Sequence, residues 1–192
     1  MKNDIILAGV GGQGILTIAA IIGKAALKAG INVKQSEVHG MAQRGGAVLA
    51  HLRLSSEPIF SDLIADGTAD VIIAVEPMEA LRHIKGLAPD GVIVTNSVPV
   101  TNIPYPDLEQ LLNDIKSYKC KKQVVIDAND IAAKTATARA MNIVMLGAVS
   151  KFIDIDEALL KEVVTEKFAS KGEEVVASNI KAFEAGREAA SL

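Results

Sequence analysis

A glycine-rich turn between an apolar strand and an apolar helix constrains the fold of this 192-residue chain more than any other feature. Residues 5–8 are apolar, residues 9–14 read Gly-Val-Gly-Gly-Gln-Gly, and residues 15–29 carry apolar side chains at helical spacing before Gly30. Strand, glycine turn and helix in this order begin a Rossmann-like α/β unit. We predict that residues 31–37 form a second strand, parallel to the first, with a right-handed crossover between them.

The rest of the chain continues this α/β rhythm. Residues 47–54 alternate between apolar and more polar side chains, so this strand is expected to be antiparallel or at an edge of the sheet. Further strands are predicted at residues 71–75, 92–95 and 124–127, with helices at 78–85, 108–118, 130–140, 143–152, 155–169 and 173–190. We therefore predict a single domain over residues 1–192, a three-layer α/β/α fold with a mostly parallel or mixed sheet and a helical C-terminal region.

Composition excludes several classes of function. The single cysteine, Cys120, is too few for a disulfide framework, a four-thiolate zinc site or an iron–sulfur cluster. The net charge is −3 and the basic residues are scattered, apart from residues 119–122, which disfavours nucleic-acid binding. The three histidines lack metal-binding spacing, so we expect no metal site. Without a signal peptide or an apolar run of membrane-spanning length, we expect a cytoplasmic protein that binds no membrane.

The glycine turn is a candidate binding site for a phosphate-bearing cofactor. Glycines allow close approach of the backbone, and the N-terminus of the following helix offers unpaired N–H groups and a positive dipole. Glu37, 23 residues after Gly14, stands where a ribose-binding acid would lie. A turn that only connects the strand to the helix, without binding a ligand, would need the same glycines. The spacing of the glycines does not distinguish the binding role from this structural role. The candidate residues are Gly11, Gly12, Gln13 and Gly14.

The loop after the second predicted strand is the most unusual part of the sequence. Residues 36–46 read Ser-Glu-Val-His-Gly-Met-Ala-Gln-Arg-Gly-Gly, at a strand end where open sheets bind ligands. His39 is a candidate proton or hydrogen-bond donor, and Arg44 is a candidate clamp for an anion. Gln43, Gly45 and Gly46 are candidate binding residues. A structural role, with Arg44 paired to Glu37, explains the same residues. His51 and His83 are expected to be structural.

The two glycine motifs together resemble the gamma-type subunit or domain of the 2-oxoacid:ferredoxin oxidoreductases. The resemblance covers nearly the whole chain and includes residues 76–82, 142–147 and 179–186. Pyruvate-type members tend to carry Tyr-Gly and Ala-Arg-Gly-Gly where this chain has His39-Gly40 and residues 43–46, Gln-Arg-Gly-Gly. The sequence is therefore more similar to the indolepyruvate, or arylpyruvate, branch of the family.

This resemblance implies a beta subunit, inactive alone, of a complex that oxidatively decarboxylates aryl 2-oxoacids to acyl-CoA and reduces ferredoxin. Thiamine diphosphate, magnesium and iron–sulfur clusters are then expected in a large alpha subunit, with coenzyme A as co-substrate. Consistent with this division, neither Asp66-Gly67 nor Asp90-Gly91 stands in the Gly-Asp-Gly frame of a thiamine diphosphate site. Our hypothesis is that the two glycine motifs form one surface facing the partner's thiamine and CoA pocket, with Arg44 as the anion clamp.

Three alternatives remain at this stage. The chain fits the equivalent subunit for pyruvate, a branched-chain oxoacid or 2-oxoglutarate. It also fits an autonomous NAD-binding oxidoreductase that uses Glu37 for the ribose, or a subunit needed only for assembly.

Overall fold

The apolar segments form one mixed sheet. The computed structural model describes residues 1–40, 45–102 and 104–191, and within them six strands follow the order β2-β3-β1-β4-β5-β6. These strands are β1 (Lys2–Val10), β2 (Asn32–His39), β3 (Ala47–Ser55), β4 (Ala69–Ala74), β5 (Leu87–Asn96) and β6 (Lys122–Ile126). Strands β1, β4, β5 and β6 are parallel, whereas β3 is antiparallel to both β1 and β2.

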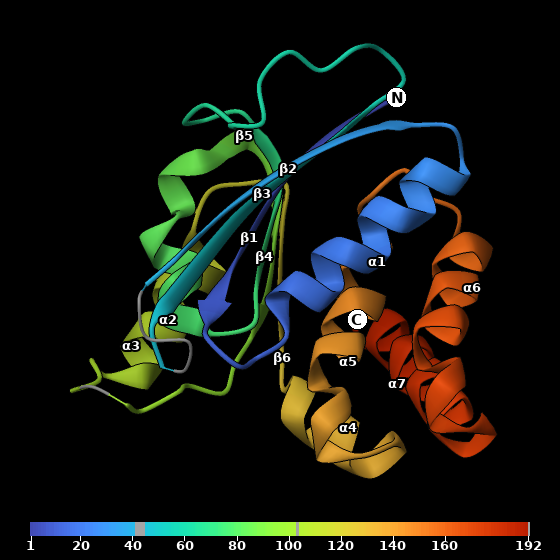
Figure 1. Cartoon of the computed structure of the whole chain (residues 1–192). Coiled ribbons are helices and arrows are strands. Elements are labelled where there is room, and N and C mark those ends of the chain that lie inside the picture. The colour runs from blue at the N-terminus through green and yellow to red at the C-terminus, as the bar shows by residue number, and fades with distance from the viewer. Residues whose placement is uncertain (41–44, 103, 192) are drawn as a thin grey trace.

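Helices cover both faces of this sheet (Figure 1). On one face lie α2 (Pro77–Arg82) and α3 (Leu108–Ser117), and on the other lie α1 (Ile15–Lys28), α4 (Ala128–Thr135), α5 (Met141–Val149), α6 (Glu157–Phe168) and α7 (Glu173–Ala189). Short 3₁₀ turns occur at η1 (Ile84–Gly86), η2 (Ala138–Ala140) and η3 (Ala169–Lys171). The predicted three-layer α/β/α fold with a helical C-terminal region is confirmed.

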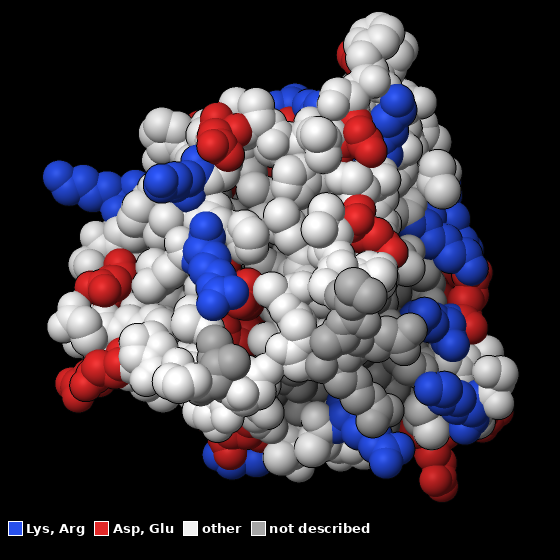
Figure 2. All heavy atoms as spheres, turned by 60° about the vertical axis from the view of Figure 1, so that its left-hand side comes forward, with Lys and Arg blue, Asp and Glu red and all other residues white. Residues whose placement is uncertain are grey.

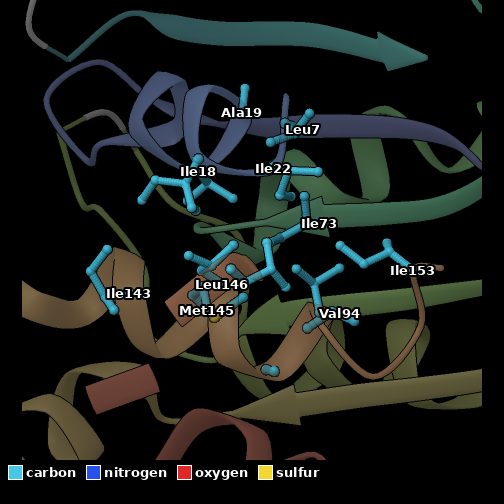
Figure 3. Packing of buried hydrophobic residues seen from close by; sticks show 14 of the residues in the cluster. Leu7, Ile18, Ala19, Ile22, Ile73, Val94, Ile143, Met145, Leu146 and Ile153 are labelled. Atoms are coloured by element: carbon cyan, nitrogen blue, oxygen red, sulfur yellow. The ribbon is translucent and has the colours of Figure 1, made fainter. Parts of the chain in front are cut away.

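The core forms because successive strand residues point to opposite faces. Ile5 and Leu7 of β1 are buried on the side of α1 and α5, and Ile6 and Ala8 are buried on the side of α2. Figure 3 shows the larger cluster, in which Ile73 and Val94 of the sheet lie close to Leu146 of α5. A central sheet covered on both faces accounts for the continuous apolar runs in the sequence.

The position of β2 corrects the prediction that the first two strands of the chain form one βαβ unit of neighbouring strands. β2 runs in the same direction as β1, but β3 lies between them and pairs with both. The strand at residues 47–54 was expected to be antiparallel or at an edge of the sheet. It is antiparallel, but it does not lie at an edge. β2 takes the edge because most of its side chains are polar and exposed, including Lys34 and Glu37.

Some predicted boundaries also change. The helix predicted at residues 78–85 ends at Arg82 and continues as η1, and the one predicted at 130–140 ends at Thr135 before η2. The strand predicted at 92–95 extends over the whole of Leu87–Asn96. The helix ends differ by a few residues, as boundaries read from a sequence commonly do, and Pro89, Asp90 and Gly91 interrupt the apolar run at the start of β5.

Two helices in the C-terminal region cross at glycines. A Cβ at Gly147 of α5 would overlap the backbone oxygen of Phe183 in α7, and a Cβ at Gly186 would overlap that of Val144. Phe183 itself is fully buried in the larger core cluster. Gly147 and Gly186 therefore allow α5 and α7 to approach each other closely.

The fold brings several loops to one end of the sheet. The segments that follow β1, β2, β4, β5 and β6 all leave from this end, and β3 begins there (lower end of the sheet in Figure 1). This is the edge at which open α/β sheets bind ligands. Within the residues that the structure describes, no helix is both long and apolar enough to cross a membrane.

Candidate functional site

The glycine turn has the backbone geometry that only glycine adopts easily. Gly12 and Gly14 have φ angles of 98° and 81°, in the left-handed region. Gly14 is the N-cap of α1, and its carbonyl oxygen accepts hydrogen bonds from the backbone N–H groups of Thr17 and Ile18. No described side chain caps this helix, so its first N–H groups and the positive end of its dipole face the turn.

Gln13 holds this turn from inside. Its Oε1 accepts a hydrogen bond from the Val10 N–H at 2.8 Å, and its Nε2 donates to the carbonyl oxygen of Val75 at 3.1 Å. The side-chain amide therefore ties the end of β1 to the end of β4. Among the predicted binding residues, Gln13 positions the turn, while Gly11, Gly12 and Gly14 line the pocket beside it.

The two glycine motifs are bonded to each other. The Gly11 N–H donates to the Gly46 carbonyl oxygen at 2.8 Å, and the Gly45 N–H donates to the Gly11 carbonyl oxygen at 3.3 Å. Gly45 also has a positive φ, of 81°. The structure thus brings Gly11 to Gly14 together with Gly45 and Gly46, and we call this assembly the glycine edge. Gln43 and Arg44 lie outside the described residues.

His39 joins the glycine edge at the rim of a pocket of about 360 Å³. The imidazole is exposed, and its Nδ1 lies 3.4 Å from the carbonyl oxygen of the neighbouring Gly40. Apart from His39, the lining is glycine backbone, one hydroxyl and apolar side chains, namely Val10, Gly11, Gly12, Gly14, Ile15, Leu16, Thr17 and Val48. Such a pocket can offer N–H donors, one imidazole and an apolar wall to a ligand.

A segment after β5, which the sequence did not single out as part of the site, supports this edge. The Asn102 side-chain Nδ2 donates to the Gly45 carbonyl oxygen at 2.6 Å. The same segment is anchored on Glu76, whose Oε1 accepts hydrogen bonds from the Tyr105 hydroxyl at 2.6 Å and from the Val100 N–H at 3.4 Å. The three prolines of residues 99–106, at a strand end on the ligand edge, were the available signal.

Glu76 has a structural role rather than a place in the pocket. It is fully buried and caps α2, its Oε2 accepting a hydrogen bond from the Glu79 N–H at 3.0 Å. Burial, together with the Glu76 carboxylate, raises the pKa of Tyr105, which keeps the phenol protonated as a donor. Asn96 is likewise buried and bonds Asn129 and the Ala128 N–H, tying β5 to α4.

The NAD-binding alternative is not supported. Glu37 lies on β2, the exposed edge strand, where its carboxylate accepts a hydrogen bond from Gln35 at 3.4 Å. In a dinucleotide site the ribose-binding acid ends the strand next to the glycine strand. Here β3 separates β2 from β1, so the topology of that site is absent.

The two remaining histidines have structural surroundings. His51 Nδ1 accepts a hydrogen bond from the Ile64 N–H at 3.0 Å, and burial lowers its pKa. Burial also lowers the pKa of His83, whose Nε2 lies 3.8 Å from a Glu79 carboxylate oxygen. In the part of the chain that the structure describes, no three His, Cys, Asp or Glu side chains gather in a way that could hold a metal ion.

Charge on the surface is mixed. Figure 2 shows Lys and Arg interspersed with Asp and Glu on the side of the molecule that carries α2 and α3. A nucleic acid needs a continuous basic track, which this face does not present.

Comparison with known proteins defines the class. The family model described as pyruvate ferredoxin/flavodoxin oxidoreductase matches residues 4–189. The chain belongs to this family.

Individual proteins are similar to this chain over nearly its whole length. The chain is 37% identical to "Indolepyruvate oxidoreductase subunit IorB" of Thermococcus kodakarensis, over 98% of this chain and 96% of the relative. The protein of the same description from Pyrococcus horikoshii is 36% identical over the same shares. Among solved structures, the 2-oxoglutarate:ferredoxin oxidoreductase from Magnetococcus marinus superimposes with a TM-score of 0.80 at 28% identity, covering 99% of this chain and 31% of that one.

Proposed function

We propose that this chain is the small, beta-type subunit of an indolepyruvate, or arylpyruvate, ferredoxin oxidoreductase. The observation that carries the proposal is the similarity to subunits of that description, at 36–37% identity over nearly the full length of both chains. The complex would convert aryl 2-oxoacids oxidatively to acyl-CoA, release carbon dioxide and pass the electrons to ferredoxin. We place it in the cytoplasm.

Thiamine diphosphate with its magnesium ion, and the iron–sulfur clusters, would be held by a larger alpha subunit. This chain has one cysteine, too few to ligate a cluster. Asp66-Gly67 precedes β4 and Asp90-Gly91 lies early in β5, so neither pair stands at the glycine edge where a diphosphate would meet the chain. The Magnetococcus marinus neighbour supports the division, because this chain covers only 31% of that chain, which leaves most of it for other parts of the enzyme.

The glycine edge would complete the partner's thiamine and CoA pocket. The backbone N–H groups of Gly12 and Gly14, just before the N-terminus of α1, suit an anionic group of CoA or of the oxoacid. His39 would donate a hydrogen bond at the pocket rim, and Gln13 would keep the turn in shape. Gln43 and Arg44 would follow on the same loop, with the Arg44 guanidinium as the anion clamp. No residue of this chain acts as a nucleophile in this proposal.

The same subunit in a complex for another 2-oxoacid is the second candidate. The similarity to a 2-oxoglutarate enzyme favours it, although at 28% identity rather than 37%. The pocket of this chain does not distinguish the two candidates, because in this proposal the side chain of the oxoacid would contact the partner subunit.

The test is to purify the chain together with its thiamine-dependent partner and to assay CoA-dependent ferredoxin reduction. Indolepyruvate, phenylpyruvate, pyruvate and 2-oxoglutarate would be compared. We expect activity only with both chains present, and kcat/KM for the arylpyruvates at least about tenfold above that for pyruvate. If the complex turned over another oxoacid but neither arylpyruvate, the proposed substrate class would be wrong. Full activity of the partner alone would defeat the subunit role.

A further inference from the structure

One buried carboxylate holds both ends of the segment that contacts the glycine edge. Residues 99–106 follow β5, and we call them the proline loop; residue 103 lies outside the described part of the chain. The Oε1 atom of Glu76, which is fully buried, accepts hydrogen bonds from the Val100 N–H at 3.4 Å and from the Tyr105 hydroxyl at 2.6 Å. Two points of the proline loop, on either side of Asn102, are therefore tied to a single oxygen atom.

These two attachment points restrict the residues between them. Pro99, Pro104 and Pro106 flank the two donors, and each proline fixes its own φ angle. The Asn102 N–H also donates to the Val100 carbonyl oxygen at 3.0 Å. Asn102 is exposed, and an exposed side chain on a free loop would lose conformational entropy on forming a contact. A loop that is already fixed on both sides lowers this cost.

Asn102 connects the proline loop to the glycine edge. Its Nδ2 donates to the Gly45 carbonyl oxygen at 2.6 Å, and the Gly45 N–H donates to the Gly11 carbonyl oxygen at 3.3 Å. Gly11 lines the pocket at the glycine edge, which we call the glycine pocket, whereas Glu76, Tyr105 and Asn102 are not among its lining residues. A series of contacts thus runs from the buried carboxylate to the wall of the glycine pocket.

We propose that Tyr105, anchored on Glu76, is a positioning residue for the ligand at the glycine edge and acts through Asn102 from outside the pocket. The hydrogen bond from phenol to carboxylate sets where the proline loop presents Asn102, and Asn102 fixes the Gly45 backbone against Gly11. Loss of the phenol hydroxyl therefore loosens the pocket wall without removing any group that touches the ligand. Only the identity of this ligand, CoA or the oxoacid, rests on the proposed function.

The test compares Tyr105→Phe with Tyr118→Phe, a change at the only other tyrosine of the chain. Both side chains are half-buried against the core cluster on the side of α2 and α3. Within the described residues only the Tyr105 hydroxyl forms a hydrogen bond, so Tyr118→Phe is a matched control. In the full chain alone, amide hydrogen exchange at Gly45 should accelerate at least about threefold in Tyr105→Phe and stay unchanged in the control.

Steady-state kinetics of the complex with the large subunit supply a readout that a merely structural bond would not change. Tyr105→Phe should raise the KM for CoA or for the oxoacid at least about threefold, while kcat stays within about twofold of its original value. A bond that only stabilised the fold would lower the unfolding midpoint and leave both kinetic constants as they are. Tyr118→Phe should leave KM and kcat unchanged.

A double variant tests whether Tyr105 acts through Asn102. If it does, Tyr105→Phe/Asn102→Ala should show the same KM and the same exchange rate at Gly45 as Asn102→Ala alone, because the contact that Tyr105 positions is already lost. Two independent effects would multiply, and a multiplied effect would contradict the proposed route.

Further outcomes would overturn the proposal. These are unchanged exchange at Gly45 in Tyr105→Phe, faster exchange there with an unchanged KM in an active complex, or equal effects of Tyr118→Phe. The proposed function fails separately, if the complex turns over none of the four oxoacids. Faster exchange at Gly45 in Tyr105→Phe would still support the positioning role in that case. Unchanged exchange at Gly45, with normal turnover of an arylpyruvate, would refute the positioning role and leave the proposed function standing.

Discussion

Glycine serves opposite purposes in two regions of this molecule. At the glycine edge, Gly12 and Gly14 adopt positive φ angles, and a Cβ on Gly12 would meet nothing within 4 Å. At the crossing of α5 and α7, Gly147 and Gly186 have ordinary helical geometry, but a Cβ on either would overlap backbone of the other helix. The first region needs the backbone freedom of glycine, and the second needs its lack of a side chain.

This difference separates a site from a scaffold. Around Gly12 the glycine edge presents unfilled space, and the backbone there contributes little to packing. The helix crossing leaves no space, and it holds the C-terminal helices together against the sheet. Substitutions in the first region should therefore change activity more than stability, and substitutions in the second should do the opposite.

The largest expected effect is on stability, from Gly147→Ala. The new methyl group would push against the Phe183 carbonyl, which cannot move without separating α5 from α7, so the free energy of unfolding should fall by about 3 kcal/mol. Chemical denaturation measures it. Gly23→Ala in α1 is the control, because its Cβ would make an ordinary contact with Val33 at 3.5 Å. Equal stability of the two variants would contradict a close crossing.

Gly12→Ala should affect activity more than stability. The left-handed conformation costs a residue with a Cβ about 1–2 kcal/mol, and the methyl group would project into the glycine pocket. We expect kcat/KM of the assembled complex to fall about tenfold, by interference with ligand binding. Gly30→Ala at the far end of α1 has the same kind of strain, with φ 73° and open space. The Gly30→Ala variant should lose as much stability as Gly12→Ala but keep full activity. An equal loss of activity in both variants would show that the effect of Gly12→Ala comes from lost stability and not from the pocket.

Asn102→Ala tests the support of the glycine edge. Loss of the hydrogen bond to Gly45 should cost about 1 kcal/mol locally. Amide hydrogen exchange at Gly11 and Gly45 is expected to accelerate, with little change in the global unfolding midpoint. Asn32→Ala, which removes side-chain hydrogen bonds to Ser55 and Glu57 at the other end of the sheet, is the control. Unchanged exchange at Gly45 would mean that the edge holds its shape without this contact.

The smallest expected effect is a pH dependence of stability that comes from His51. Burial lowers the pKa of His51, and its Nδ1 must stay unprotonated to accept from Ile64. Its contribution to stability is therefore present above its unfolded pKa of about 6.5 and is lost as the pH falls through its lower folded value. Asp4, Asp62 and Asp66 oppose this shift, and Arg53 adds to it.

Thermal unfolding between about pH 7 and about pH 5 measures this dependence. His51→Asn, which keeps an acceptor but cannot titrate in this range, should lose less stability on acidification than the unaltered chain. If the His51→Asn variant loses as much stability on acidification as the unaltered chain, the structural role of His51 is wrong.

The sequence predicted the layers of this fold because its signals were local. Apolar runs, helical spacing and the glycine turn each act within about ten residues, and they located most of the elements. The pairing of β3 between β1 and β2 was not predictable in this way. It depends on which strand leaves its side chains exposed, and the polar residues Lys34 and Glu37 were read as a parallel strand rather than as an edge.

The candidate site was predictable to a similar extent. Its two glycine motifs stand out in the chain, and the structure joins them through Gly11, Gly45 and Gly46. The support from Asn102 was not predictable, because Asn102 and Gly45 come together only when segments distant in the sequence fold against each other.

The most direct test of the glycine edge as part of a catalytic site is the steady-state kinetics of the Arg44→Ala complex, measured together with its subunit composition. If the edge faces the partner's CoA and thiamine pocket, the complex assembles normally and its KM for CoA or for the oxoacid rises. Loss of assembly, with unaltered kinetics in the complex that remains, would contradict this account and show that the edge serves only the contact between subunits.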